Sequence, residues 1–366
     1  MIVVVVGGGI AGLSVAAELA DAGAKVVVLE AKAIASGASG VATSYLEPRL
    51  GQTAMRRLEW EALARWENYA AQLVDRTGLD VGFRTEGQLK VTTAANLEVF
   101  EKDMEKRSAQ AWPLERLDFA QVLELEPSLS TDIVDAAYLP QVRWVTGARV
   151  CQALAAQLRA DGHDVREQCA VTAIAPEGAG IVITTSSGDT IKADRIVLAN
   201  GMGTSSITGL PEDLPESRPV RGVNLIASLD GLAQPIRHLI KHHRGNLCPR
   251  VDENGKAHLI IGTTYEPGET SLEPNTDIIE KLYANAEPIL PQVRELPRIA
   301  VTAGLRTKVG DGNLNLGRSR QMPGVFWSLS HAGAGYLRAP VVAPELAQFV
   351  LTGEPGDWTG ICTGGA

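Results

Sequence analysis

The chain has 366 residues, of which 45% are hydrophobic and 21% are charged, and its formal net charge is −9. This length favours two domains with a sizeable core, and the acidic balance argues against nucleic acid or an anionic membrane as a partner. No apolar run approaches the roughly 20 residues that a membrane-spanning helix needs, so we expect no membrane insertion.

Four scattered cysteines without a C-x-x-C pair are typical of a reducing compartment. The first apolar strand begins at residue 2, which leaves no room for a basic segment of the kind that opens a signal peptide. We therefore expect a cytoplasmic protein. We expect no metal site, since the three histidines at 238, 242 and 243 have no carboxylate or cysteine spaced to complete one.

The first 30 residues predict a strand, a turn, a helix and a second strand. Ile2–Val6 is an apolar run suited to a strand buried on both faces, and Leu13–Ala22 is rich in helix-forming Ala and Leu. Val26–Leu29 is the second strand, and Glu30 ends it. This order is typical of a dinucleotide-binding unit.

The turn in this unit carries glycines in the order G-x-G-x-x-G, at Gly7, Gly9 and Gly12. Gly7 suits a tight turn, Gly9 lets the backbone approach a phosphate, and Gly12 lets the helix pack closely on the strand. Glu30 is placed to accept hydrogen bonds from ribose hydroxyls.

The next part of the chain loses the alternation of strands and helices. The stretch 36–40 is a loop of small residues, and the patterns predict helices over 53–77, 96–109 and 118–125, a hairpin over 81–93 and a strand over 136–145. We interpret 81–145 as an inserted α+β portion.

The second half begins with an amphipathic helix over 147–161 and ends with a helix over 344–351, after the Gly-rich turn 331–336. Between them the patterns predict strands over 165–174, 180–185, 190–199, 219–228, 237–241, 246–251, 257–264, 299–305 and 325–328, and a helix over 276–289. The group from 219 to 264 reads as an antiparallel sheet.

Four separate stretches together resemble one family. They are the glycine turn with Glu30, the loop 36–40, the apolar strand 193–201 (ADRIVLANG) and the block from Gly304, which reads GLRTKVGDGNLNLGR and then VFWSLSHAGAGYLRAP. Over nearly the whole chain they resemble the D-amino-acid oxidase-like flavoenzymes, which include glycine oxidase, sarcosine oxidase and D-amino-acid dehydrogenases.

The resemblance implies an α/β fold with a Rossmann-like FAD-binding domain of the two-dinucleotide-fold type and an α+β substrate domain on a largely antiparallel sheet. In this division residues 1–80, 146–215 and 299–366 form the FAD-binding domain, and residues 81–145 and 216–298 form the substrate domain. The strand near 193–199 is expected beside the first strand, with its end over the cofactor. In the sarcosine oxidase-type enzymes that the chain resembles, a cysteine in the region of 304–311 binds the flavin covalently. This chain has no cysteine there, so the resemblance implies non-covalent FAD.

The resemblance also implies which residues contact FAD. The expected set is Gly7, Gly9, Ile10, Ala11, Gly12, Glu30, Ala31, Ser39, Gly40, Thr43, Ser44, Val171, Gly201, Gly333, Gly335, Tyr336 and Leu337. A Gly-rich turn ahead of a helix favours negative charge, such as that of the reduced flavin, so the group around Gly335 is reasonable on physical grounds too.

For the substrate, the resemblance points to Arg306, whose two parallel donors match a carboxylate. His331, Tyr265 and Arg49 are further candidates for the catalytic pocket, and Tyr45 and Arg338 for its wall. The implied activity is FAD-dependent oxidation of the C–N bond of a small amine or a glycine-like, D- or N-alkyl amino acid. Hydride passes to flavin N5, the imine product hydrolyses, and oxygen or another acceptor reoxidises the flavin.

Two alternatives stay open. One is an FAD-dependent 2-hydroxy-acid dehydrogenase, which needs a base such as His331. The other is a flavin-binding protein with a drifted pocket, because Thr307 and Asn246 stand where the family commonly has Pro and Tyr.

Overall fold

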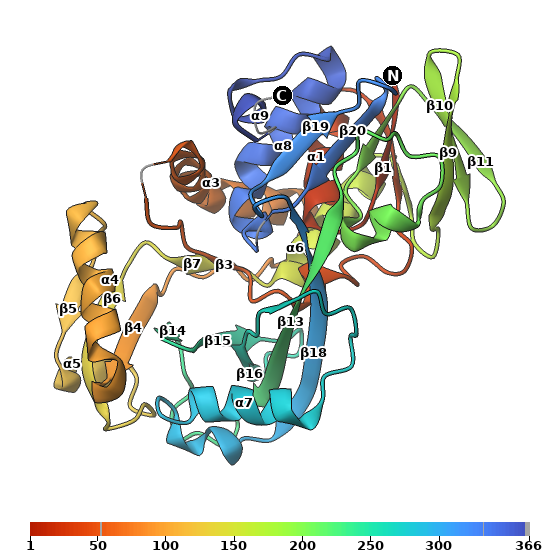
Figure 1. The fold of residues 1–366 in the computed structure, drawn as a ribbon. Helices are drawn as coiled ribbons and strands as arrows, with labels where there is room; N and C mark the ends of the chain where they lie inside the picture. The colour runs from red at the N-terminus through yellow and green to blue at the C-terminus, as the bar shows by residue number, and fades with distance from the viewer. Residues whose placement is uncertain (52, 332, 363–366) are drawn as a thin grey trace.

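The computed structural model describes residues 1–51, 53–331 and 333–362, and Figure 1 shows two large sheets joined by the long strands β13 and β18. The first sheet has the order β19-β20-β12-β1-β2-β8 and is parallel except for β19. Its strands are β1 Ile2–Val6, β2 Lys25–Leu29, β8 Asp164–Arg166, β12 Arg195–Leu198, β19 Asn315–Arg318 and β20 Val325–Leu329. The predicted strand–turn–helix–strand unit is confirmed, and so is the place of the strand near 193–199 beside β1.

The predicted single strand over 190–199 is wrong, because the chain changes sheets at Asp194. β11 Thr190–Ala193 belongs to a three-stranded antiparallel sheet with β10 Gly180–Thr185 and β9 Val171–Glu177, whereas β12 belongs to the six-stranded sheet. The Asp194 backbone N–H donates to the Ile2 carbonyl over 3.0 Å, and its carboxylate accepts from the Ile2 N–H over 2.6 Å. The predicted strand over 165–174 is likewise divided, into β8 and β9.

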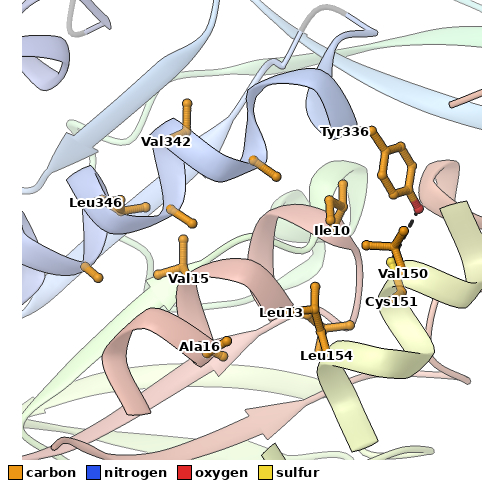
Figure 2. Close-up of a cluster of buried hydrophobic side chains, with 14 of the residues drawn as sticks. Ile10, Leu13, Val15, Ala16, Val150, Cys151, Leu154, Tyr336, Val342 and Leu346 are labelled. Carbon is orange, nitrogen blue, oxygen red and sulfur yellow. Dashed lines mark hydrogen bonds between the residues drawn. The ribbon is translucent and has the colours of Figure 1, made fainter. Parts of the chain in front are cut away.

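Four helices pack with the six-stranded sheet in one core: α1 Ile10–Asp21, α3 Ala54–Thr77, α6 Gly147–Ala160 and α8 Gly335–Thr352. Figure 2 shows α1 between α6 and α8, with Leu13 near Leu154 and Val15 facing α8. α1 begins at Ile10 instead of Leu13, because Gly9 is extended and caps it. The glycine turn therefore leads straight into the helix.

α8 begins nine residues before the predicted helix, despite Pro340 and Pro344 inside it. A proline has no N–H for the carbonyl four residues before it. Side chains of α3 fill both gaps: Trp66 Nε1 donates to the Tyr336 carbonyl over 3.0 Å, and Arg65 Nη1 donates to the Pro340 carbonyl over 3.3 Å. These contacts from another helix explain why the local sequence pattern missed the first half of α8.

The second large sheet is mostly antiparallel and has the order β17-β13-β16-β15-β14-β4-β6-β5, with β18 on β13. Its strands are β4 Gln88–Thr93, β5 Glu115–Leu117, β6 Ile133–Leu139, β13 Ser217–Ser228, β14 Leu239–His242, β15 Gly245–Val251, β16 Ala257–Gly262, β17 Glu266–Pro267 and β18 Arg298–Val309. Helix α7 Thr276–Ala286 lies along one side of it (Figure 1), and α4 Leu97–Ala109 and α5 Phe119–Leu125 pack near its other end. The predicted antiparallel sheet is confirmed.

Two predictions in the inserted portion are wrong. Residues 81–93 form no hairpin, since only β4 is a strand, and Arg84 makes an isolated bridge to Trp144. The strand expected over 136–145 is two strands, β6 and β7 Arg143–Trp144, and β7 pairs with β3 Tyr45–Leu46. The remaining elements are α2 Ala38–Val41, α9 Asp357–Cys362 and the 3-10 turns η1 Ala94–Asn96, η2 Gly201–Ser206 and η3 Pro291–Arg294. No helix of the described part is long and apolar enough to cross a membrane.

A buried carboxylate fastens α3 to α8. Glu59 is fully buried, and its Oε1 accepts from Arg338 Nε over 3.1 Å and from Nη2 over 2.6 Å. Arg338 is fully buried too, and Arg49 donates to the same carboxylate from the segment before α3. Because both charges are out of water, each depends on the other.

We expect Glu59→Leu to lower the free energy of unfolding by about 3–5 kcal/mol, because it leaves Arg338 buried without a counter-ion. The matched control is Glu61→Leu on the same helix, whose pair with Arg65 is exposed and whose loss we expect to cost about 0.5 kcal/mol or less. Urea unfolding at fixed cofactor concentration measures both. Equal losses in the two variants would contradict the prediction.

Candidate functional site

The glycine turn lies at the carboxyl end of β1, where the predicted contacts with a phosphate were placed. Gly7 has φ of +113°, and a Cβ there would lie 2.7 Å from the Ala199 carbonyl oxygen. A Cβ on Gly12 would lie 2.1 Å from the Gly7 carbonyl oxygen. Both positions therefore need glycine for the geometry that the motif predicts. The turn leads into the N-terminus of α1, a position that favours an anion.

Glu30 lies beside this turn. Its carboxylate accepts from the Gly8 N–H over 2.7 Å and from the Lys32 N–H over 2.9 Å. The segment that leads to Val171 runs alongside, since the Cys169 N–H donates to the Glu30 carbonyl over 2.8 Å. Glu30, the exposed Ala31 and Val171 are thus gathered at one edge of the sheet, next to the glycine turn.

The loop of small residues and the start of α8 meet at the same place. Ser39 Oγ accepts from the Ile10 N–H over 3.1 Å, and the Ser39 carbonyl accepts from the Tyr336 hydroxyl over 2.9 Å. The Tyr336 hydroxyl also lies 3.4 Å from Cys151 Sγ (Figure 2). A Cβ on Gly335 would lie 3.4 Å from Ile10 Cγ2, so the amino ends of α1 and α8 adjoin.

The other predicted cofactor residues surround this point less directly. Gly40 is packed under the Ala35 carbonyl, and Ser44 has φ of +50° and is held through its carbonyl by the Val145 N–H. The Thr43 carbonyl accepts from the buried Arg250. Gly201 begins η2 after β12, near Thr307 of β18. Ala11 follows Ile10 in the first turn of α1, and Leu337, in the first turn of α8, is buried in the core.

Arg306 extends from β18 across the second sheet. A Cβ on Gly222 would lie 2.5 Å from Arg306 Nη2, so the guanidinium covers that glycine. Its hydrogen bonds are long and go to neutral oxygens: 3.1 Å to Thr263 Oγ1, 3.4 Å to the Thr264 carbonyl and 3.5 Å to the Arg221 carbonyl. Among the residues that the structure describes, no carboxylate forms an ion pair with it.

Burial lowers the pKa of Arg306, and the nearby Tyr45, Tyr265 and Glu266 offset part of that shift. The guanidinium stays charged at neutral pH, since arginine is effectively always protonated. Gly333 lies on its other flank, with the Arg306 side chain 3.9 Å from where a Cβ would be. A half-buried cation is therefore placed between the second sheet and the Gly-rich turn before α8, and none of the residues at 1–51, 53–331 and 333–362 supplies a counter-ion.

The other catalytic candidates differ in their surroundings. His331 is half-buried, its Nε2 lies 3.0 Å from Ser328 Oγ, and its Nδ1 has no partner among the described residues. Burial lowers the pKa of His331 to about 4. Tyr265 is 64% exposed in the loop after β16. Arg49 and Arg338 do not join Arg306, because both are bound to Glu59.

Sequence reasoning missed the residues that hold Arg306 and those that flank it. Gly222, Thr263 and Thr264 come from β13 and from the loop after β16, and no local pattern distinguishes them. Asn224 offered one signal: it is a polar residue within the apolar run of β13, yet it is only 3% exposed.

These features fit a dinucleotide. The N-terminus of α1, the glycines that allow close approach and a carboxylate at the end of β2 are the groups that bind a pyrophosphate and a ribose. The described residues contain no group of three or more His, Cys, Asp or Glu side chains arranged to hold a metal ion.

Comparison with known proteins identifies the family. A family model described as FAD dependent oxidoreductase (DAO) matches residues 3–349. A glycine oxidase of Bacillus licheniformis is 29% identical over 96% of this chain and 93% of its own length, and one of Pseudomonas aeruginosa is 28% identical over 96% and 95%. The crystal structure of a glycine oxidase from Bacillus cereus superposes with a TM-score of 0.88 and 25% identity, covering 98% of this chain and 96% of that one.

Matches of this extent also confirm the resemblance, the fold class and the cofactor expected from the sequence. The chain belongs to the DAO family, and it is an FAD-dependent oxidoreductase of the glycine oxidase and amino acid oxidase type.

Proposed function

We propose that the enzyme oxidises the C–N bond of a small amino acid, glycine-like, D- or N-alkyl, whose carboxylate is bound by Arg306. The observation that carries the proposal is the half-buried guanidinium over Gly222, which forms no ion pair within the described part of the chain. Such a cation is most stable when an anion joins it, and two parallel N–H donors suit a carboxylate. The glycine oxidases to which the chain is similar support a small amino acid as the substrate.

For the cofactor, we propose that Gly9, Ile10 and Ala11 face the pyrophosphate, Glu30 the ribose and Val171 the adenine. Ser39, Thr43, Ser44 and the turn from Gly333 to Leu337 would line the flavin side. When bound, FAD supplies the acceptor for the two electrons. We also propose that it is held non-covalently, that residues 81–145 and 216–298 form the substrate domain, and that the enzyme works in the cytoplasm.

The chain's own contribution is to orient the substrate. Arg306 fixes the substrate carboxylate. This limits the orientations of the bound substrate and so fixes the position of its α-carbon. No side-chain base is required when the amine reacts in its neutral form. The role of Arg306 is the same whether oxygen or another electron acceptor reoxidises the flavin.

The 2-hydroxy-acid alternative is weaker because its base would be His331. With a pKa of about 4, His331 is neutral at pH 7 but is a poor proton acceptor. The drifted-pocket alternative rests on Thr307 and Asn246. If this alternative holds, the protein would bind no small carboxylate at Arg306.

We expect Arg306→Ala to slow flavin reduction by the best substrate about 30- to 1000-fold, the equivalent of about 2–4 kcal/mol for a bidentate charged contact. Arg306→Lys should recover part of this, because one ammonium does not reproduce the planar fork. Anaerobic stopped-flow absorbance measures the rate. Arg218→Ala, an exposed arginine of β13, is the control. An unchanged rate and affinity in Arg306→Ala would place the carboxylate elsewhere.

We expect His331→Asn to leave the rate of amino-acid oxidation within about fivefold. Because His331 titrates near pH 4, the pH profiles of the variant and the wild type should coincide between pH 6 and 9. A 2-hydroxy-acid dehydrogenase that used this base would instead lose about 10²–10⁴-fold. Steady-state rates with amino acids and 2-hydroxy acids distinguish the two results.

We expect Glu30→Ala to weaken FAD binding by about 1–3 kcal/mol, the scale of a hydrogen bond to a charged group. The control is Glu167→Ala, because Glu167 accepts from the Ile34 N–H over 2.8 Å and so supports the same loop. Titration of the apoprotein with FAD gives both affinities, and acid should release all the FAD. Similar losses in both variants would show that Glu30 acts only through the loop.

A further inference from the structure

The segment 41–47 lies against the second sheet and contains Thr43, which we proposed to line the flavin side of the cofactor site. Two cationic side chains of that sheet hold the segment in place. Arg250 of β15 donates from Nη2 to the Thr43 carbonyl, and Lys241 of β14 donates to Glu47 over 2.6 Å. Both cations are therefore fixed next to a segment that is proposed to line the cofactor.

Only one of these two cations is balanced by a neighbouring carboxylate. Lys241 forms an ion pair with Glu47. Arg250 is 6% exposed, and it donates from Nη1 to the Pro249 carbonyl over 2.7 Å as well as to the Thr43 carbonyl. Within the part of the chain that the structure describes, no carboxylate forms an ion pair with Arg250. The charge of Lys241 is thus balanced where it lies, whereas that of Arg250 is not.

The titratable groups around Arg250 leave its charge in place. Burial lowers the pKa of Arg250 to about 10, with Cys248 opposing that shift and Arg84 adding to it, so the guanidinium is still protonated at pH 7. Burial raises the pKa of the Cys248 thiol to about 11, so the thiol is neutral. His258, opposite Arg250 in β16, has its pKa lowered by burial and by Arg250, and it is mostly neutral at pH 7. These neighbours supply no negative charge.

The hydrogen bonds of Arg250 do not explain why a charge is buried here. An uncharged amide could donate to the Thr43 carbonyl without the desolvation penalty that a guanidinium carries. The effect of the charge extends beyond its contacts, because a charge in the low-dielectric interior is little screened over distances of about 10 Å. A group in this range whose own charge changes would respond to Arg250.

In the proposed function, the flavin is such a group. Oxidation of the substrate delivers a hydride, which is two electrons and one proton, and the reduced flavin then carries a negative charge. A nearby positive charge stabilises this anionic form more than the neutral oxidised form.

We propose that the buried charge of Arg250 raises the reduction potential of the bound FAD by favouring its anionic reduced form. This inference rests on the proposed function, which places the flavin against Thr43 and Ser44. Arg250 acts at a distance through its charge and is not a catalytic residue.

The test compares two replacements of Arg250 in the holoenzyme. Arg250→Gln removes the charge but keeps an N–H donor, whereas Arg250→Lys keeps a positive charge. Each protein is reduced slowly, without substrate and without oxygen, in the presence of a reference dye, and the absorbances of flavin and dye give the equilibrium constant between them. We expect Arg250→Gln to shift this constant about tenfold toward oxidised flavin, which is about 30 mV for a two-electron couple. Arg250→Lys should shift it by less than about threefold, because the charge is retained.

The control is Arg244→Gln, which removes an exposed cation at the turn of the same hairpin and should leave the equilibrium constant unchanged. A second pair of variants acts on the charge without replacing Arg250. Cys248→Asp adds a carboxylate two residues away on β15, and Cys248→Asn adds an uncharged group of the same shape. We expect Cys248→Asp to shift the constant toward oxidised flavin relative to Cys248→Asn.

Three results would overturn the inference. The first is an unchanged constant in Arg250→Gln. The second is an equal shift in Arg250→Gln and Arg250→Lys, because the bond to Thr43 and not the charge would then set the potential. If Arg250→Gln does not retain FAD, the Cys248 variants decide, and equal constants in those two are the third.

These outcomes are separate from those of the proposed function. The potential is measured without substrate, so an unchanged rate in Arg306→Ala would refute the carboxylate site and leave the result for Arg250 intact. The place of the flavin is checked with Ser44→Asn, because asparagine tolerates the positive φ of Ser44 and enlarges the side chain. We expect weaker FAD binding and a shifted flavin spectrum in this variant, and no change in either would refute that place.

Discussion

The antiparallel register between β13 and β18 is the constraint on which the candidate site depends. It places Val220 opposite Arg306 and Asn224 opposite Thr302. Side chains in a strand alternate between faces, so a slip of one residue would move Arg306 to the side of α7 and away from the glycine turn. The pairing joins eleven residues of each strand, and its inward residues Val223 and Leu225 are fully buried. The hydrophobic core beneath the sheet therefore fixes the position of a charge above it.

The molecule treats its buried charges in two ways. Glu59 of α3 is paired with Arg338 of α8. Burial alone would raise the pKa of Glu47, but Lys241, Arg107 and Lys90 together lower it to about 2. Arg306 lacks such a partner among the described residues. In the described part of the chain, the buried Arg250 also has only carbonyl partners, those of Pro249 and Thr43. Arg306 differs from it because its hydrogen bonds are long and its side chain is half-exposed, which leaves the guanidinium able to bind an anion.

The dinucleotide-binding unit could be predicted from sequence because its signals are local. Ile2 to Glu30 contains the strand, the turn, the helix and the acid in order, and each has a short-range cause. The start of α8 and the division of the strand at Asp194 could not be predicted, because they depend on Trp66, Arg65 and Ile2 far away in the sequence. For the same reason Gly222 and Asn224 could not be recognised from the sequence, because their places on the face that carries Arg306 follow only from the strand register. Arg306 was predicted to bind the substrate carboxylate only from the family resemblance, because its local sequence pattern does not distinguish it.

The contact between Trp66 and α8 also bears on the order in which the protein folds. Trp66 and the carbonyl that it supports are 270 residues apart in the chain, and the amino end of α8 adjoins that of α1. Contacts of such long sequence separation form late, because closing a large loop costs entropy before any contact is gained. We therefore expect the contact between Ile10 and Gly335 to form only after α8 has been synthesised. If FAD binds at these two helix ends, it can bind only after that point.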